Sequence, residues 1–148
     1  MLAARLSALV HLFNKGKADL PDGTLHKDCV FRLNGRAYHD GLGRPASDPL
    51  VRLIGCGPAG YRLLVAALRY AIPDATVAIE EHLTERQTEN GFALTARASL
   101  SGLPRDSAMP FGSECGLVLH GDPTGHIREI AVTMDDAAVG QIKAARAR

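Results

Sequence analysis

The stretch from Leu53 to Gly60, Leu-Ile-Gly-Cys-Gly-Pro-Ala-Gly, carries the most specific chemical pattern in the chain. A short apolar run, Gly-x-Gly-x-x-Gly and the start of a helix form the fingerprint of a dinucleotide-binding turn. Glycines there let the backbone approach a pyrophosphate, which rests on the positive end of the helix. Glu80 and Glu81 follow about 20 residues later, where the acidic partner of a ribose belongs. One hypothesis is therefore a flavin- or nicotinamide-dependent oxidoreductase fragment.

The surroundings of this turn favour a simpler explanation. Everything after Glu81 has the pattern of an antiparallel meander, whereas a doubly wound fold alternates strands with helices. The chain after Gly60 is also too short for the remaining strands, helices and a catalytic region. Gly55 and Gly57 then only relax a loop, and Pro58 suits the first turn of a helix. We therefore expect no bound cofactor.

The histidines and cysteines form no metal or nucleophile pattern. The chain has six histidines, and they show neither His-x-His nor His-Glu-x-x-His spacing, so we expect no metal site. No Gly-x-Ser-x-Gly elbow and no Cys–His pair indicates nucleophilic catalysis. Three cysteines without a Cys-x-x-Cys pair, Cys29, Cys56 and Cys115, are typical of reduced thiols in a cytoplasmic protein.

Two further groups have both a chemical and a structural explanation. Tyr38, His39 and Asp40 can supply an acid or base at the mouth of a pocket, although a solvated turn is the simpler explanation. Arg97 can reach an anionic ligand from a middle strand, or it can pair with Glu80 across the sheet.

Composition indicates an ordinary globular domain. The 148 residues, 46% hydrophobic and 22% charged, favour a single domain spanning residues 1–148 with one sizeable core. The net charge of +1, with both signs interspersed, argues against binding to nucleic acid or to an anionic membrane surface. No apolar stretch approaches the roughly 20 residues that span a bilayer.

The elements that must position these residues are two helices and a set of strands. An apolar stripe predicts a first helix from Leu2 that ends at 14–16, and a second stripe predicts a helix from Tyr61 that Pro73 ends. Residues 17–48 carry one short strand at most, at 29–33. Alternating patterns then predict strands at 75–85, 92–100, 114–120 and 126–136, followed by a short tail.

The connections decide the fold class. Short turns at 89–91 and 121–125 join strands that must be antiparallel, because a parallel pair needs a crossover of a dozen or more residues. Helices packed on one face of an antiparallel sheet make an α+β fold.

From Gly60 onward the chain resembles the SnoaL-like polyketide cyclase group of the nuclear-transport-factor-two-like superfamily. The resemblance is carried by Gly-Tyr-Arg-Leu-Leu at 60–64, Pro-Asp at 73–74, Phe-Ala-Leu-Thr-Ala-Arg at 92–97 and Gly-His-Ile-Arg-Glu at 125–129. It implies a cone-shaped, cystatin-like fold in which a curved antiparallel sheet wraps around helices and encloses a mostly apolar pocket. It also implies a homodimer and a hydrophobic small-molecule ligand.

The same resemblance implies one catalytic residue, and the chemistry of its reaction suggests a partner for it. In the cyclases an Asp near the end of the last strand acts as a general acid and base on an enolisable substrate, and it matches Asp135 here. A partner that hydrogen-bonds the enolate oxygen would stabilise the developing charge, and His120 on the preceding strand is the candidate. A shift of one residue in register would turn His120 outward.

Two departures from the family pattern affect this chemistry. The aromatic residue that usually lies four residues before the catalytic Asp is Ala131 here, and the loop at 103–113 is shortened. Both favour a remodelled pocket. Three hypotheses stay open: a cofactor-free cyclase or isomerase using Asp135, a non-catalytic ligand-binding or dimerisation module, and the oxidoreductase fragment.

Overall fold

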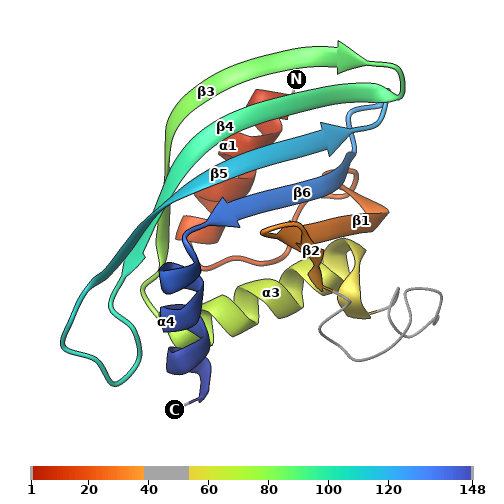
Figure 1. The fold of residues 1–148 in the computed structure, drawn as a ribbon. Helices are drawn as coiled ribbons and strands as arrows, with labels where there is room; N and C mark the ends of the chain where they lie inside the picture. Colours follow the sequence, from red (N-terminus) through yellow and green to blue (C-terminus); the bar gives the residue numbers. More distant parts are fainter. Residues whose placement is uncertain (1, 39–53, 148) are drawn as a thin grey trace.

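The computed structural model describes residues 2–38 and 54–147, and for residues 82 and 83 it describes the backbone only (Figure 1). In chain order the elements are α1 (Leu2–Asn14), β1 (Leu25–Leu33), β2 (Arg36–Ala37), α3 (Gly57–Ala71), β3 (Thr76–Thr88), β4 (Gly91–Gly102), β5 (Phe111–Gly121), β6 (Ile127–Met134) and α4 (Asp136–Ala147).

The strands form one six-stranded sheet in the order β2-β1-β6-β5-β4-β3. Strands β3 to β6 are an antiparallel meander, as the turn spacing predicts. Strand β1 differs, because it runs parallel to β6 and antiparallel to β2. The sheet is therefore mixed, and the expectation of purely antiparallel pairing is corrected at this one neighbour.

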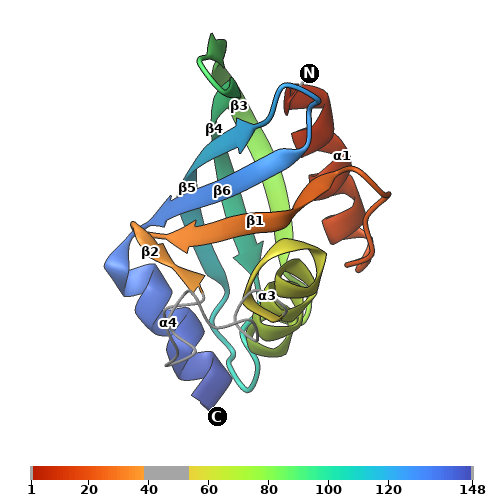
Figure 2. The ribbon, with the colours of Figure 1, turned by 90° about the vertical axis from the view of Figure 1, so that its right-hand side faces the viewer.

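The sheet is strongly curved, and its two faces are covered differently. Helices α1 and α3 lie on the same, concave side of the sheet, whereas no described helix crosses the convex side (Figure 2). We call these sides the inner face and the outer face. This arrangement confirms the predicted α+β fold with a cone-shaped sheet around helices.

The core lies between the inner face and the two helices. Helix α1 buries the predicted stripe, Leu2, Leu6, Leu9 and Phe13. Helix α3 buries Tyr61 and Val65. The sheet contributes the alternate residues of two neighbouring strands: Leu94, Ala96, Ala98 and Leu100 from β4, and Cys115, Leu117 and Leu119 from β5. Every second residue therefore points inward, as a period of two requires.

Three elements differ from the sequence predictions, and one of them is β2, a second strand in a segment expected to carry one at most. Strand β1 begins at Leu25 rather than at residue 29, because a register shift between Leu25 and Val30 interrupts the alternation that reveals a strand. The expected tail is helix α4, which buries Ala138 and Ala145. These small residues give a weak apolar stripe, so packing rather than periodicity identifies this helix.

Two asparagine side chains fasten the edges of this assembly. The amide of Asn14, at the end of α1, donates to Val77 O and accepts from Val77 N, both at 2.8 Å. Asn34, in the β1–β2 turn, does the same to Met134, at 2.9 and 2.8 Å. Each amide replaces one missing rung of a sheet ladder.

Candidate functional site

His120 lies on the outer face near the end of β5. Its neighbour Leu119 is fully buried on the inner face, so alternation turns the imidazole outward. Its Nε2 is 3.7 Å from Oε2 of Glu129, and Oε1 of Glu129 accepts a hydrogen bond from Nε of Arg32 at 2.7 Å. About half of the imidazole is exposed, with 45% of the side chain accessible to solvent.

Asp135 lies between β6 and α4 and begins the helix. Its Oδ1 accepts a hydrogen bond from the backbone N–H of Ala137 at 3.2 Å, and its carbonyl accepts one from Val139 at 3.0 Å. This is the geometry of a helix N-cap. The residue is exposed, so its carboxylate faces solvent rather than an apolar enclosure.

The structure does not bring these two predicted residues together. His120 pairs with Glu129 across the β5–β6 ladder, whereas Asp135 follows Met134, which pairs with Cys115. Six residues of extended chain separate Glu129 from Asp135, a distance of roughly 20 Å at the usual rise of a strand. A single small substrate cannot contact both side chains at once.

The glycine-rich turn has a packing explanation. A Cβ at Gly57, whose φ is +64°, would lie 2.2 Å from the carbonyl oxygen of Lys27 on β1. A Cβ at Gly60 would lie 2.7 Å from the carbonyl carbon of Gly55. The glycines therefore admit another stretch of this chain's own backbone, and Pro58 occupies the first turn of α3 as expected.

The context of the turn also differs from that of a dinucleotide site. Residues 54 and 55 are helical rather than extended, and the three residues before them lie outside the described residues. Strand β3 passes through Glu81 and returns as β4 in a hairpin, so no crossover helix follows. The fold is not the doubly wound fold that the fingerprint needs.

The other sequence candidates serve local structure or lie outside the description. Arg97 pairs with Glu81 rather than Glu80, with Nη1 4.0 Å from Oε2, because a bulge after Ile79 shifts the register by one residue. His39 and Asp40 lie outside the described residues. In the described part of the chain, no three His, Cys, Asp or Glu side chains could hold a metal ion.

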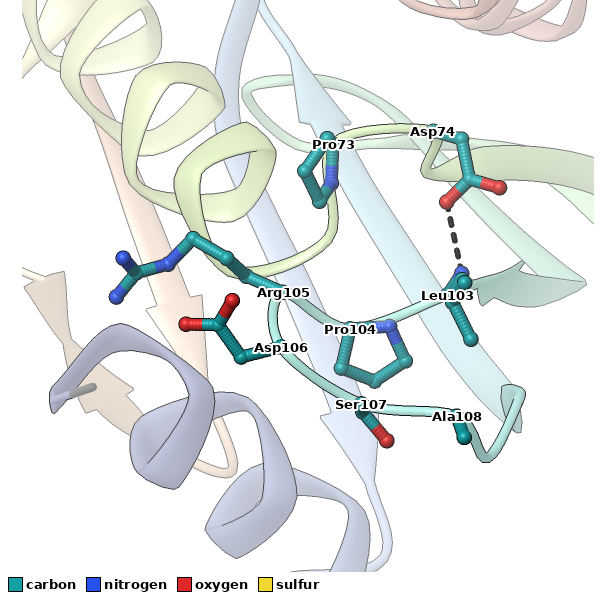
Figure 3. A pocket seen from close by; sticks show the side chains of 8 residues that line it. All are labelled: Pro73, Asp74, Leu103, Pro104, Arg105, Asp106, Ser107 and Ala108. Atoms are coloured by element: carbon teal, nitrogen blue, oxygen red, sulfur yellow. Dashed lines mark hydrogen bonds between the residues drawn. The ribbon is translucent and has the colours of Figure 1, made fainter.

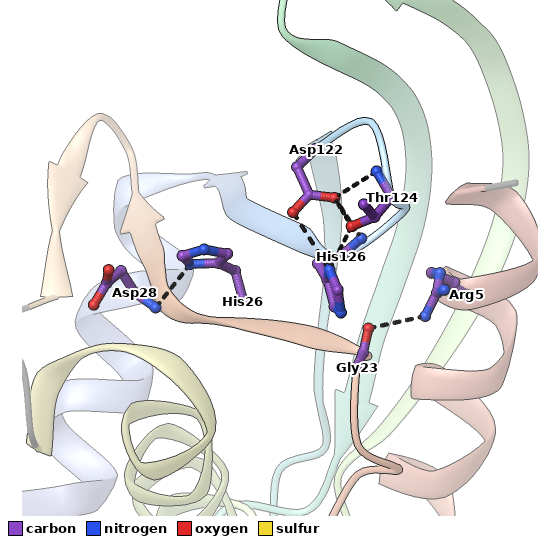
Figure 4. Close-up of polar contacts among 7 residues, drawn as sticks. All are labelled: Arg5, Gly23, His26, Asp28, Asp122, Thr124 and His126. Carbon is purple, nitrogen blue, oxygen red and sulfur yellow. Dashed lines mark hydrogen bonds and ion pairs between the residues drawn. The ribbon is translucent and has the colours of Figure 1, made fainter.

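In the turn at 121–125, the carboxylate of Asp122 accepts hydrogen bonds from other residues of the turn and from His126. Asp122 accepts hydrogen bonds from the hydroxyl and the backbone N–H of Thr124 and from the backbone N–H of His126, at 2.6, 2.9 and 3.0 Å (Figure 4). Burial raises the pKa of Asp122, but these hydrogen bonds and the nearby His126 outweigh it and lower the pKa to about 2. This carboxylate stabilises a hairpin turn, as its sequence predicts.

A hollow of about 560 Å³ opens where the β4–β5 loop meets the end of α3 (Figure 3). It is lined by Pro73, Asp74 and residues 103–108. The Asp74 carboxylate accepts a hydrogen bond from the backbone N–H of Leu103 at 2.7 Å, so it is used to hold the loop. Neither His120 nor Asp135 lines this hollow.

The inner face holds a polar group that the sequence did not single out. Tyr61, in the first turns of α3, is only 7% exposed, and its ring lies 6.2 Å from that of Phe31 on β1. Its hydroxyl is buried and has no hydrogen-bond partner among the residues that the structure describes. Buried hydroxyls are nearly always satisfied in native proteins, so this one requires an explanation.

Two buried cysteines lie on the elements that hold Tyr61. Cys29 precedes Phe31 by two residues on the same face of β1, and Cys56 is the N-cap residue of α3. Burial raises the pKa of Cys29 to about 12, with Cys56 and Glu129 adding to the effect. Burial also raises the pKa of Tyr61 to about 12, against the opposing charge of Arg69. Both groups therefore stay protonated at neutral pH, and Cys29 is not a thiolate nucleophile.

The charge that acts on the pKa of this hydroxyl is that of Arg69, whose side chain is only partly buried. In residues 2–38 and 54–147 no buried side chain is a carboxylate, an imidazole, an amine or a guanidinium. No sequence signal distinguishes Tyr61 from an ordinary core residue, since it belongs to the apolar stripe of α3. Tyr61 differs from an ordinary core residue only in that its hydroxyl lacks a hydrogen-bond partner, and this can be seen only in the structure.

Solved structures share this architecture over nearly the whole chain. An NTF2-like protein of unknown function from Exiguobacterium sp. 255-15 has a TM-score of 0.60 at 16% identity, covering 89% of this chain and 98% of that one. A proposed SnoaL-like polyketide cyclase from Jannaschia sp. CCS1 has a TM-score of 0.62 at 15% identity, with coverages of 95% and 91%. The chain has the NTF2-like fold. IdmH from Streptomyces antibioticus, a proposed polyketide cyclase, has a TM-score of 0.63 at 18% identity, covering 95% of this chain and 97% of that one.

At these identities the likeness shows the fold alone, and at that level the predicted resemblance to SnoaL-like proteins is confirmed. No protein-family model matches the sequence, and no curated protein matches it. No helix of the described residues is long and apolar enough to cross a membrane.

Proposed function

We propose that the inner face between β1 and α3 binds a hydrophobic small molecule that presents one neutral hydrogen-bond acceptor to Tyr61. The observation that carries this proposal is the buried hydroxyl without a partner. Such a group destabilises the empty protein by about 1–3 kcal/mol, and a bound carbonyl oxygen would remove that cost. The apolar residues around it would hold the rest of the ligand.

The same environment favours binding over chemistry. Abstraction of a proton from carbon needs a base within hydrogen-bond reach of the reacting atom. In the described part of the chain, the buried residues near Tyr61 include no such base. A phenol and a thiol that both keep their protons can orient a carbonyl group, but they cannot deprotonate the carbon beside it.

A pair of probe molecules tests this proposal. We expect 1-acetonaphthone, an apolar aromatic ketone, to bind more tightly than 1-ethylnaphthalene, which has a similar shape and no acceptor. Tyr61→Phe should weaken ketone binding roughly fivefold and leave hydrocarbon binding unchanged. Binding is measured by titration followed by NMR.

The matched control is Tyr70→Phe, the same change on the same helix at a ring that is half exposed. It should leave both affinities unchanged. If Tyr61→Phe binds the ketone as tightly as the wild-type protein does, the hydroxyl is not the recognition group and the proposal fails.

A second candidate function is cofactor-free proton transfer by Asp135, and the neighbours described as polyketide cyclases favour it. In this version the carboxylate removes a proton from the carbon beside a carbonyl group and returns it elsewhere. His120 would bind an enolate oxygen only in a separate substrate complex, because one small substrate cannot contact both side chains. The separation of the two side chains argues for testing them one at a time.

Deuterium exchange measures this chemistry directly. In D2O, catalysed proton abstraction would replace the acetyl protons of 1-acetonaphthone with deuterium. Asp135→Asn should abolish the exchange and keep the fold, because Asn caps a helix about as well as Asp does. Asp136→Asn is the control. Exchange at the wild-type rate in Asp135→Asn would eliminate this role, and His120→Gln tests the imidazole in the same assay.

We also propose that the protein is a cytoplasmic homodimer that pairs through the outer face. Support comes from the absence of a described helix over that face and from its small central side chains, such as Val118 and Ala131. The three buried cysteines form no disulfide bond with one another, which suits a reducing compartment. Sedimentation of Val118→Arg tests the dimer: monomers are expected, and an unchanged dimer would place the interface elsewhere.

A further inference from the structure

A second hollow lies beside α1 at the margin of the core, to which its lining residue Leu9 also belongs. It has a volume of about 300 Å³ and lies between α1 and the segment that leads into β1. Its lining is mostly apolar and comes from both elements: Ala4, Ala8, Leu9, Leu12, Leu20 and Pro21, with Arg5, Asp22 and Thr24. The volume is at the lower end of the range of small-molecule sites, roughly 300–1,000 Å³.

Arg5 is held at this hollow by one hydrogen bond. Its Nη1 donates to the carbonyl oxygen of Gly23 at 3.2 Å, so the side chain reaches from α1 to the facing segment (Figure 4). Gly23 has a φ of +84°, a conformation that glycine adopts without strain. The half-buried guanidinium keeps Nε and Nη2 without a partner among the described residues.

We propose that this hollow binds a small apolar monocarboxylate, with the carboxylate on Arg5 and the hydrocarbon chain along Ala8, Leu12 and Leu20. A guanidinium fixed by one contact presents its other N–H groups as a fork, which matches the two oxygens of a carboxylate. The side chains of Ala8, Leu12 and Leu20 carry no polar group, so this part of the lining suits a hydrocarbon chain.

The charges around the hollow select the class of ligand. Asp22 also lines this hollow, and its negative charge repels anions. The positive charge of Arg5 and the negative charge of Asp22 therefore partly cancel. A doubly charged phosphate would need more positive charge than Arg5 alone supplies, whereas one carboxylate neutralises it. Of the four buried residues of α1, only Leu9 lines this hollow, whereas Leu2, Leu6 and Phe13 do not, and neither Tyr61 nor Phe31 lines it.

Octanoate is the probe, and 1-octanol is its uncharged counterpart. We expect octanoate to bind the wild-type protein and to shift the amide NMR signals of α1 and residues 20–24. Arg5→Gln should weaken octanoate binding roughly tenfold or more, because it removes a charge-assisted pair. It should leave the weaker binding of 1-octanol unchanged.

Two further variants act in opposite directions within the same hollow. Asp22→Asn removes the repelling charge and should strengthen octanoate binding roughly twofold. Ala8→Phe fills the apolar part and should abolish the binding of both probes. Arg128→Gln removes the same charge from an exposed position on β6 and should change nothing.

The outcomes decide the proposal. If the wild-type protein does not bind octanoate at millimolar concentration, or binds it equally well in Arg5→Gln, the site is not a carboxylate site. Signal shifts confined to β1 and α3 would assign octanoate to the inner face instead, and that would also overturn it.

Discussion

The two faces of the curved sheet differ in how their polar groups are satisfied. On the outer face, Glu129 lies between Arg32 and His120, and all three side chains reach solvent. On the inner face, the hydroxyl of Tyr61 has neither solvent nor a partner among the described residues. A polar group that is already satisfied has little need of a ligand, so the comparison directs attention to the inner face.

Truncation of one side chain on each face should show the largest difference in stability between the two faces. Leu119 is fully buried on the inner face, and Val118 is its outward-pointing neighbour on β5. We expect Leu119→Ala to lower the free energy of unfolding by about 3 kcal/mol and Val118→Ala to lower it by less than about 1 kcal/mol. Chemical denaturation measures both. Equal losses would mean that the outer face is buried too, as a tight dimer would require.

Substitution of Gly57 tests the close contact between α3 and β1, and substitution of Gly140 is its control. Gly57→Ala places a Cβ against Lys27 O at a positive φ and should lower the free energy of unfolding by about 2 kcal/mol. Gly140→Ala, in open space within α4, should raise it by about 0.5 kcal/mol. Thermal denaturation of both variants shows whether the signs are opposite. If Gly57→Ala leaves the free energy of unfolding unchanged, close packing does not explain the glycine, and the nucleotide-binding explanation of the turn would have to be reconsidered.

Removal of the unsatisfied hydroxyl should stabilise the protein. Tyr61→Phe keeps the ring and deletes the oxygen, so we expect the free energy of unfolding to rise by about 1 kcal/mol. Tyr70→Phe should leave it unchanged. A loss of stability in Tyr61→Phe would show that the hydroxyl has a partner, and the contrast between the faces would then disappear.

The turn that joins β5 to β6 should respond to acid. The pKa of Asp122 is lowered in the folded protein, so the folded state binds fewer protons than the unfolded state. Its contribution is complete above about pH 4 and declines as the pH falls toward about 2. Asp122→Asn should cost about 1 kcal/mol at pH 7, and the difference from wild type should shrink over that window. A constant difference would refute the assignment.

The smallest effect is expected on the outer face. Glu129→Gln disrupts a partly exposed ion pair and should lower the free energy of unfolding by less than about 1 kcal/mol. Because salt screens exposed charges, this loss should be smaller in 1 M NaCl than in 0.1 M NaCl. A large loss that salt does not change would indicate that the cluster is buried against a partner.

The parts of the fold that follow local periodicity could be predicted. The stripe of α1 and the alternation from Leu94 to Leu100 are repeated signals, and short turns force antiparallel neighbours. Strand β1 and helix α4 could not be predicted with the same means. Their places depend on pairing with β6 and on packing of small residues such as Ala145, which are properties of distant parts of the chain.

The candidate site was less predictable than the fold. Family resemblance proposed Asp135 and His120 by motif position, but motif position says nothing about which face a residue occupies. The alternation of Leu117 and Leu119 could have shown that His120 points outward. Tyr61 had no signal, because a satisfied and an unsatisfied tyrosine have the same place in an apolar stripe.

The parallel pairing of β1 with β6 has a consequence for synthesis of the protein. Val30 lies beside Glu129, so β1 must wait for a strand that is synthesised much later than itself. Until β6 emerges, the edge of β1 is open and Phe31 lacks part of its cover. Contacts between residues so distant in sequence slow folding and leave hydrophobic, aggregation-prone surface exposed until folding is complete. A ribosome-bound chain that stops before residue 127 would therefore be a natural client for chaperones.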